Sequence, residues 1–281
     1  MIIVKIFGGF GNQLFQYACA RALSIKTGAP FFMDLSSFRR PVIRLKRRPI
    51  YLYQLDQYSI VENKYRGSNF FIPVRRYCEK SFAHDETVLN FKDGVFLEGY
   101  WQSPRYFEAI AALLQQDLVY KNPLSSSACL IEDQIRSTCS VGLHFRRGDY
   151  LSPPFNRVFP VMPISYYQEA VERLARQFEN LHLFVFSNDQ DWAQDHVKFS
   201  HPTTYIRPQL TQNPLEDFEL LRICKHTVIS NSSFSWWAAW LNQNPEKQVF
   251  SPKTWLKTDP NATRDLIPSS WTLLDVSLND L

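Results

Sequence analysis

The feature that most constrains the fold is a regular alternation of short strand-like and helical segments from residue 140 onward. Apolar runs rich in Val, Ile, Phe and Thr are separated by segments whose apolar residues repeat at helical spacing. The predicted strands are 140–145, 181–187, 203–206, 226–230 and 248–251, and the predicted helices are 165–179, 191–197, 214–225 and 233–242. Strands separated by helices need crossover connections, so this part of the chain should form a parallel, doubly wound sheet.

The first part of the chain opens with the same kind of unit. The apolar run IIVKIF is followed by a glycine-rich turn and by a helical stripe that Gly28 ends. Residues 103–118 predict a single further helix. The segment KNPLSSS, residues 121–127, then breaks the pattern, so we expect two α/β domains, at residues 1–122 and 128–281.

Composition excludes several classes of protein. At 281 residues and 45% hydrophobic content, the chain is long enough for two hydrophobic cores. Its five cysteines are scattered and contain no Cys-x-x-Cys pair, which favours reduced thiols. No window approaches the roughly 20 apolar residues of a membrane helix, and the first residues do not resemble a signal peptide. We therefore expect a soluble, cytoplasmic protein.

The charge of the chain is mild, with one local exception. A net charge of +4 argues against a dedicated nucleic-acid binder. Six of the ten residues of RRPVIRLKRR, residues 39–48, are basic. This segment is either a solvated loop or a patch that faces an anionic partner, such as a membrane surface or a phosphate-linked glycan.

Ligands of doubly wound sheets bind in the loops that follow the strands, and two such loops suit phosphate. In GGFGNQ, the glycines allow a close backbone approach to a ligand, although Leu14 stands where a dinucleotide fingerprint needs glycine, and a plain tight turn is the alternative. After strand 140–145 come Arg146 and Arg147, whose planar guanidinium groups suit phosphate. Arg146 shares the strand face of His144, whereas a structural alternative pairs Arg147 with Asp149.

Two further polar clusters follow predicted strands. Ser187, Asn188 and Asp189 can face a ligand or merely cap the next helix. Asp189 and Asp191 match an Asp-x-Asp metal pattern that is common by chance, so we expect no metal. In ISNSSFSWWAAWLN, the serines begin a helix and offer hydroxyl groups and amides to an anion, whereas core packing explains most of the tryptophans.

Five segments together resemble the bacterial α-1,2-fucosyltransferases, the glycosyltransferase family 11 group. They are GGFGNQLFQYACARALS, LEGYWQSPRYF, HFRRGDY, FVFSND and ISNSSFSWWAAWL, and the matches run in order from residue 3 to about residue 255. The resemblance implies a GT-B-like fold, with two Rossmann-type domains whose parallel sheets face a cleft. It also implies GDP-L-fucose as donor, a galactose-terminated oligosaccharide or glycolipid as acceptor, and inverting transfer to the 2-hydroxyl.

The resemblance also assigns roles to residues. The His-x-Arg-Arg motif of the superfamily implies that Arg146 holds the β-phosphate, and a superfamily spacing of sixteen residues before Ser233 implies that Asp217 binds guanine. An exposed first-turn carboxylate is the alternative for Asp217. Relatives carry a His-Gly pair where this chain has Phe159 and Pro160, which leaves the choice of acceptor open.

The predicted site divides into three groups. The predicted donor-binding residues are Gly9, Phe10, Gly11, Asn12, Gln13, His144, Arg147, Ser187, Asn188, Asp189, Asp217, Asn231, Ser232, Ser233, Phe234 and Ser235. The predicted acceptor-binding residues are Glu98, Tyr100, Trp101 and Gln102. Arg146 should offset charge on the leaving diphosphate, and Asp149 is the first choice of general base, with Glu98 as the second.

Other functions remain open from the sequence. A non-catalytic carbohydrate or nucleotide-binding module would not turn over the donor, and a fucosyltransferase of α-1,3 linkage would form a different product. A nucleic-acid binder would lose affinity for polyanions when residues 39–48 are neutralised.

Overall fold

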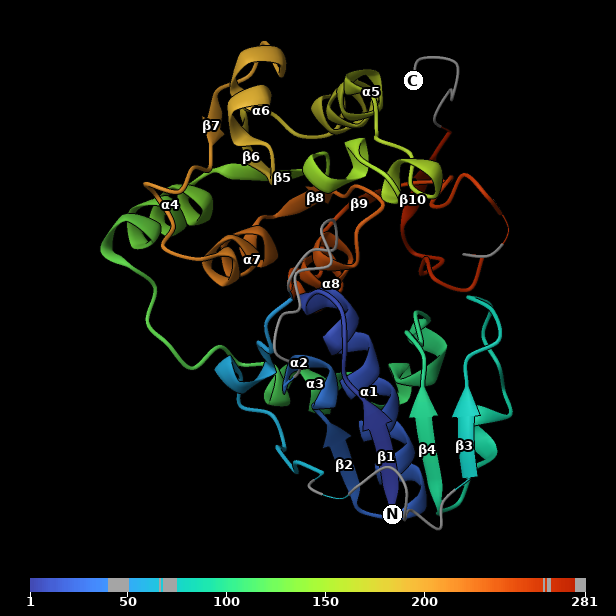
Figure 1. Ribbon diagram of the computed structural model, residues 1–281. Helices are drawn as coiled ribbons and strands as arrows, with labels where there is room; N and C mark the ends of the chain where they lie inside the picture. Colours follow the sequence, from blue (N-terminus) through green and yellow to red (C-terminus); the bar gives the residue numbers. More distant parts are fainter. Residues whose placement is uncertain (40–50, 66, 68–74, 260, 262–263, 276–281) are drawn as a thin grey trace. The chain divides into compact units, whose positions relative to one another are not determined.

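The computed structural model describes residues 1–39, 51–65, 67, 75–259, 261 and 264–275, so the basic segment 39–48 lies almost entirely outside the described residues. The chain divides into two compact units (Figure 1). The first unit contains Met1–Asn122 and Ala262–Ile267, and the second contains Pro123–Asn261 and Pro268–Leu281. The predicted boundary lies close to Asn122, but the sequence did not predict that Ala262–Ile267 joins the first unit.

The first unit is built on a four-stranded parallel sheet of order β2-β1-β4-β3. Its strands are β1 (Ile2–Lys5), β2 (Phe31–Asp34), β3 (Arg75–Cys78) and β4 (Val95–Glu98). Its α-helices are α1 (Phe10–Thr27), α2 (Ser36–Arg39) and α3 (Ala111–Asp117), and its 3-10 helices are Leu55–Gln57, Val88–Asn90, Pro104–Tyr106 and Glu108–Ile110. The strand, glycine turn and helix predicted at the start of the chain are confirmed, and Gly28 ends α1 in the left-handed conformation.

The single helix predicted over residues 103–118 is wrong. The segment forms two 3-10 turns before α3 begins at Ala111. Between the turns, Phe107 has φ −142° and ψ 0°, outside the helical region. Its ring is fully buried, with its centroid 5.9 Å from that of Phe15 on α1, so burial of this side chain takes precedence over helical periodicity.

The second unit is built on a six-stranded parallel sheet of order β10-β9-β8-β5-β6-β7. Its strands are β5 (Cys139–Phe145), β6 (Leu181–Ser187), β7 (Thr203–Tyr205), β8 (His226–Val228), β9 (Val249–Pro252) and β10 (Thr272–Leu274). Its α-helices are α4 (Ser126–Ser137), α5 (Ile164–Ala175), α6 (Gln190–His196), α7 (Pro214–Ile223) and α8 (Ser233–Leu241), and its 3-10 helices are Gly148–Leu151 and Phe155–Arg157. This is the strand order of the Rossmann fold.

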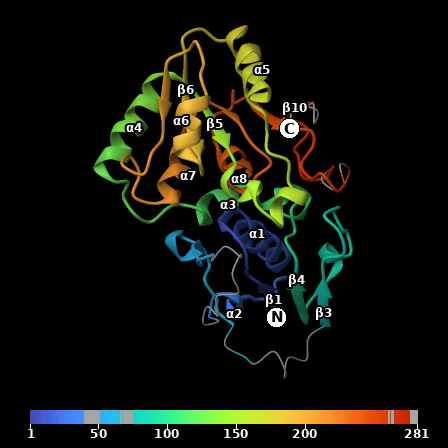
Figure 2. The same ribbon diagram turned by 45° about the horizontal axis from the view of Figure 1, so that its top comes forward.

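Helices cover both faces of the second sheet, with α5 and α6 on one face and α7 and α8 on the other (Figures 1 and 2). Gly142 of β5 permits the close packing of α7, because a Cβ atom there would lie 2.5 Å from Cδ1 of Leu221. Trp236 and Trp237 of α8 are fully buried, as predicted. Two parallel sheets in an α/β chain confirm the predicted fold class.

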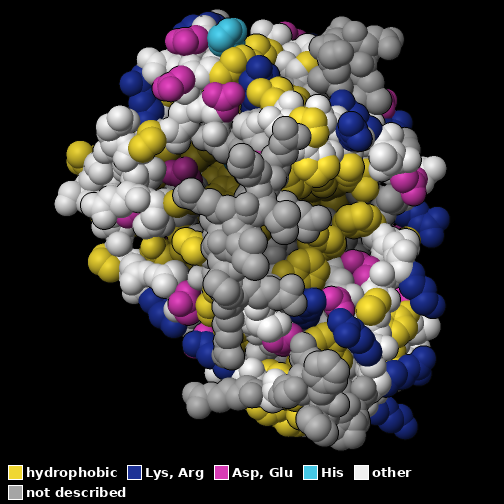
Figure 3. All heavy atoms as spheres, viewed as in Figure 1, with side chains coloured by type: hydrophobic (Ala, Val, Ile, Leu, Met, Phe, Trp, Pro, Cys, Tyr) yellow, Lys and Arg dark blue, Asp and Glu magenta, His cyan; other side chains and the backbone are white. Residues whose placement is uncertain are grey.

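Among the helices of the described residues, none is both long and apolar enough to cross a membrane. Basic side chains do gather along one border of the first unit, on the side where β3 lies in Figure 1 (Figure 3). Arg75 and Arg76 of β3 are exposed there. The edge strand β3 therefore presents two exposed arginines, of which Arg76 pairs with Glu98 of β4.

Candidate active site

The chain reverses its direction of growth across the second sheet between β5 and β8. After β5, the chain adds β6 and β7 on one side, and it then returns to add β8 and β9 on the other. In doubly wound sheets, the loops that follow the strands at such a switch point form the ligand crevice. Here these loops are residues 146–149 and 229–232.

Arg146 is the first residue after β5, and its guanidinium is held in place but not saturated. Its Nη2 lies 2.7 Å from Oδ2 of Asp149, and its guanidinium lies 5.4 Å from the centroid of the Tyr150 ring. Its Nε is buried and has no hydrogen-bond partner among the described residues. A cation with an unused buried N–H donor is suited to bind an anionic group of a ligand.

Arg147 is held by different residues. Its Nε lies 3.3 Å from Oδ2 of Asp189, and its guanidinium lies 4.1 Å from the centroid of the Trp192 ring. The alternative that pairs Arg147 with Asp149 is therefore wrong. The alternation of strand faces does not reach Arg147, because β5 ends at Phe145 and Arg147 has φ −131° and ψ −69°.

Asn188 connects the loop after β6 to the loop after β5. Its Oδ1 accepts a hydrogen bond from the backbone N–H of Arg147 at 2.8 Å, and its Nδ2 donates to Oδ1 of Asp149 at 3.2 Å. Ser187 makes a local contact instead, since its Oγ accepts from the backbone N–H of Asp189 at 3.0 Å. Ser187, Asn188 and Asp189, the residues predicted from FVFSND, thus all form contacts within the loops that follow β5 and β6.

His144 is a neutral, buried residue beneath the arginines. Its Nδ1 lies 2.9 Å from Oγ of Ser230, which follows β8, and its ring stacks on that of Phe234. Burial, together with the positive charge of Arg146, lowers the pKa of His144 to about 3. The His144 side chain therefore connects the end of β5 to the loop after β8 and does not supply positive charge.

The loop after β8 is held by its own polar groups. Nδ2 of Asn231 donates to the carbonyl oxygens of Pro160 and Trp255, at 3.0 and 3.1 Å. Pro160 thus anchors Asn231 through its backbone carbonyl. Both amide N–H groups of Asn231 are therefore engaged within the protein, whereas its buried Oδ1 has no partner among the described residues, and its predicted donor contact stays a prediction.

The serines at the start of α8 are more available. Oγ of Ser235 is buried and donates to the carbonyl oxygen of Ser232 at 3.3 Å, but the N-cap residue Ser232 makes no side-chain capping bond. Ser233 is half-buried. Its predicted contact with phosphate stays a prediction.

Asp217 lies in the first turn of α7, and it is half-buried rather than exposed, so the alternative of an exposed carboxylate is wrong. Burial raises the pKa of Asp217 to about 6, and the charge of Glu216 acts in the same direction, against a hydrogen bond with Thr211. Its Oδ1 is buried without a partner among the described residues. Glu216, in contrast, is saturated by the backbone N–H groups of Ser125 and Gln212.

A polar pocket of about 560 Å³ lies beside these loops, at the ends of β6 and β7. It is lined by residues 187–191 and 207–209 and by Gln194. The volume is in the usual range for small-molecule sites. Arg207 is an exposed cation in this lining that sequence reasoning missed, because no motif surrounds it.

In the first unit, the glycine-rich turn has the geometry of a close backbone approach. Gly8 has φ +80°, which side chains rarely adopt, and Gly9 precedes α1 without a side-chain cap. The side chain of Gln13, a predicted donor-binding residue, is engaged within the protein. Its two N–H groups donate to the carbonyl oxygens of Gly8 and Leu52, and its Oε1 accepts from Gln54.

Three further residues of this turn, Phe10, Gly11 and Asn12, were predicted to bind the sugar donor. Phe10 and Gly11 are buried, and the ring of Phe10 stacks on Tyr58. Oδ1 of Asn12 accepts a hydrogen bond from Nε2 of Gln102 at 2.8 Å. Asn12 was predicted to bind the sugar donor and Gln102 the sugar acceptor, and the two side chains instead bond to each other.

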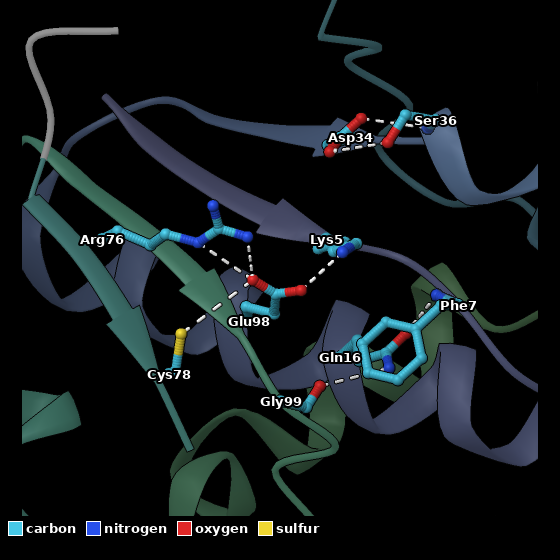
Figure 4. A network of polar contacts seen from close by, with 9 residues as sticks. All are labelled: Lys5, Phe7, Gln16, Asp34, Ser36, Arg76, Cys78, Glu98 and Gly99. Atoms are coloured by element: carbon cyan, nitrogen blue, oxygen red, sulfur yellow. Dashed lines mark hydrogen bonds and ion pairs between the residues drawn. The ribbon is translucent and has the colours of Figure 1, made fainter. Parts of the chain in front are cut away.

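Glu98, at the end of β4, is the centre of a charged cluster (Figure 4). One carboxylate oxygen accepts from Nζ of Lys5 at 2.5 Å, and the other accepts from the guanidinium of Arg76. Burial opposes ionisation of Glu98, but the contacts with Lys5 and Arg76 outweigh it and hold its pKa below the ordinary value. A carboxylate held in this way takes up a proton less readily, which weakens its case as general base.

Trp101 is fully buried, which contradicts its predicted role in binding the acceptor. The carboxylate of Glu79 accepts from the backbone N–H groups of Tyr100 and Trp101, at 2.7 and 2.9 Å. This pair of bonds holds Trp101 at φ 58° and turns its ring inward, against Tyr77.

Tyr100 lies instead in a half-buried aromatic cluster with Phe7 and Phe82, which follow β1 and β3. Its ring stacks on Phe82 at 6.0 Å and lies 5.0 Å from Phe7. Sequence reasoning missed both phenylalanines, because the signal is the adjacency of β1, β4 and β3, not a motif.

Comparison with known proteins places this geometry in context. The model of glycosyl transferase family 11 matches residues 1–274. An α-1,2-colitosyltransferase of Escherichia coli is 28% identical over 98% of this chain and 99% of its own length. The O-antigen biosynthesis glycosyltransferase WbnK of Escherichia coli is 29% identical over 94% of this chain and 97% of its own length.

More distant similarities extend to eukaryotes. Galactoside α-(1,2)-fucosyltransferase 1 of Mus musculus is 25% identical over 83% of this chain and 61% of its own length. Among solved structures, a mutant of Arabidopsis thaliana FUT1 in complex with GDP has a TM-score of 0.49 at 12% identity, covering 89% of this chain and 70% of that chain.

Proposed function

Because the chain belongs to glycosyl transferase family 11, we propose that it transfers L-fucose from GDP-L-fucose to the 2-hydroxyl of a terminal galactoside, with inversion at the anomeric carbon. The observation that carries this proposal is the pair of guanidinium groups at the switch point of a Rossmann-type sheet, each with a buried Nε that makes no hydrogen bond among the described residues. The acceptor is a galactose-terminated oligosaccharide or glycolipid, and the reaction takes place in the cytoplasm.

Arg146 supplies the electrostatic contribution to the reaction. Departure of GDP builds negative charge on the β-phosphate, and a cation already in place lowers the barrier without rearranging at the moment of reaction. The ion pair with Asp149 fixes the guanidinium before the donor binds. With this cation at the diphosphate, no metal is required.

Asp217 supplies the recognition of the base. An ionised carboxylate accepts from the ring N–H and the amino group of guanine together, whereas adenine and the pyrimidines do not present this pair of donors. The buried Oδ1 of Asp217, without a partner among the described residues, is the available acceptor.

The acceptor side is assigned to the first unit. Tyr100 and its aromatic neighbours Phe7 and Phe82 offer ring surface to a sugar at the carboxyl end of three adjacent strands, where ligands of parallel sheets bind. Asp149 is the first candidate for the general base and Glu98 the second, and each forms an ion pair, with Arg146 and Lys5 respectively.

A donor screen followed by linkage analysis tests this function. GDP-L-fucose should be consumed in the presence of a terminal galactoside, and the product should carry an α-1,2 bond. GDP-colitose is the second donor to include, because one similar protein is named a colitosyltransferase and colitose is L-fucose without its 3-hydroxyl. Binding of GDP without turnover of either donor would favour a non-catalytic module, and an α-1,3 product would correct the linkage.

A further inference from the structure

The loop that carries both arginines depends on one exposed asparagine from another strand. Asn188 accepts from the backbone N–H of Arg147 and donates to Asp149, and Asp149 in turn pairs with Arg146. The three side chains form a continuous chain from the end of β6 to the guanidinium of Arg146. Both oxygens of the Asp149 carboxylate are thereby engaged, Oδ2 by Arg146 and Oδ1 by Asn188.

The backbone of the loop is shaped to admit this amide. A Cβ atom on Gly148 would lie 2.7 Å from Nδ2 of Asn188, a distance that real Cβ atoms essentially never show. Glycine at this position therefore allows Asn188 to reach Asp149. The adjacent residue, Asp189, holds Arg147 directly, so consecutive residues after β6 hold both arginines.

We propose that Asn188 is a positioning residue: it orients Arg146 toward the diphosphate through Asp149 and the backbone of Arg147, and it does not contact the donor itself. The proposal rests on the proposed function, because it takes a nucleoside diphosphate as the ligand of Arg146. It also assigns Asp149 a positioning role in place of the general-base role predicted from the sequence.

The first test compares GDP with GMP by isothermal titration calorimetry. If Asn188 acts through Arg146, Asn188→Ala should weaken GDP binding by about tenfold, in line with the loss of one or two hydrogen bonds in a charged network. Binding of GMP, which lacks the β-phosphate, should change by less than about twofold. A direct contact of Asn188 with ribose or base, or general damage to the unit, would weaken both nucleotides equally.

The second test uses Asn188→Asp and pH. The new carboxylate keeps an acceptor for the N–H of Arg147 but faces Asp149, and two adjacent carboxylates take up a proton at higher pH than either alone. The protonated pair restores a donor between positions 188 and 149. The GDP affinity of Asn188→Asp, expressed relative to the native protein at each pH, should therefore recover as the pH falls from 8 to 5.

Several other charged groups lie near positions 188 and 149, and the ratio to the native protein at each pH cancels their contribution. They are Arg146, Arg147, Asp189, Asp191 and Arg207. Asn244 provides a matched control, because its amide also bridges two segments, accepting from the backbone N–H of Glu246 and donating to the carbonyl oxygen of Lys225 before β8. Asn244→Ala and Asn244→Asp should leave the binding of both nucleotides unchanged at every pH.

Equal losses of GDP and GMP affinity in Asn188→Ala, or a relative GDP affinity of Asn188→Asp that does not vary with pH, would overturn the proposal. Because these measurements need no transfer reaction, a native protein that binds GDP but transfers no sugar would refute the proposed function and leave this test intact.

Discussion

Replacing Asp217 with asparagine should stabilise the ligand-free protein at neutral pH and weaken its binding of GDP. Burial raises the pKa of Asp217 from 3.8 to about 6. Since the folded state holds this proton more tightly than the unfolded state, the free energy of unfolding falls as the pH rises from about 4 to about 6, and the full cost persists above that range. A difference of about two pKa units corresponds to about 3 kcal/mol.

The expected effect therefore has a pH signature. Above about pH 7, Asp217→Asn should unfold with a free energy up to about 3 kcal/mol higher than that of the native protein, whereas at pH 5 about half of this gain should remain. Urea titration followed by tryptophan fluorescence measures it in the relevant unit, because every tryptophan except Trp101 lies in the second unit. The carbonyl oxygen of asparagine can still accept from Thr211, so that contact does not confound the comparison.

Two results would refute the reasoning. The first is that Asp217→Asn is no more stable than the native protein at pH 8, or that its gain in stability is the same at pH 5 and pH 8. Either outcome would mean that ionisation of Asp217 does not lower the free energy of unfolding. If the variant is more stable but binds GDP and other nucleoside diphosphates as the native protein does, the cost exists but does not serve recognition of guanine.

Three further predictions concern the chemistry. Arg146→Ala should lower kcat/KM at least a hundredfold, about 3 kcal/mol, and Arg146→Lys should recover little because lysine lacks the planar fork; near-normal turnover of Arg146→Ala would contradict its role. EDTA should leave turnover intact, and a loss that manganese restores would instead support a metal at Asp189 and Asp191. Asp149→Asn should slow transfer and acceptor-independent donor hydrolysis together, because both need a positioned Arg146; loss of transfer alone would identify Asp149 as the base.

Much of the second unit could be predicted because its signals are local. Apolar runs and helical stripes located β5, β6 and α8 to within a residue or two, and the alternation of strands and helices fixed a parallel sheet. The short strand β10 was missed, since three residues, two of them exposed, carry too little periodicity to be recognised.

The site was less predictable, because side-chain partners depend on where the backbone leaves its regular element. The position of Arg146 and Arg147 after β5 followed from the sequence, but their partners did not, since the chain turns at Arg147 and strand parity ends there. The same holds for Trp101. It reads as an exposed aromatic residue beside Glu98, whereas the bonds from Glu79 turn it into the core.

The return of Ala262–Ile267 to the first unit also bears on how the chain folds as it is synthesised. Asp265 accepts from the backbone N–H of His84 and pairs with Arg105, while its carbonyl oxygen accepts from Ser103, and Leu266 is buried. The ribosome must therefore add nearly the whole second unit before these partners of the first unit exist, an interval on the order of 10 to 30 seconds at typical elongation rates. During that interval the first unit lacks the segment that contacts Ser103, Arg105 and His84. In a chimaera of two relatives joined at residue 122, this segment of the first unit would come from the other parent.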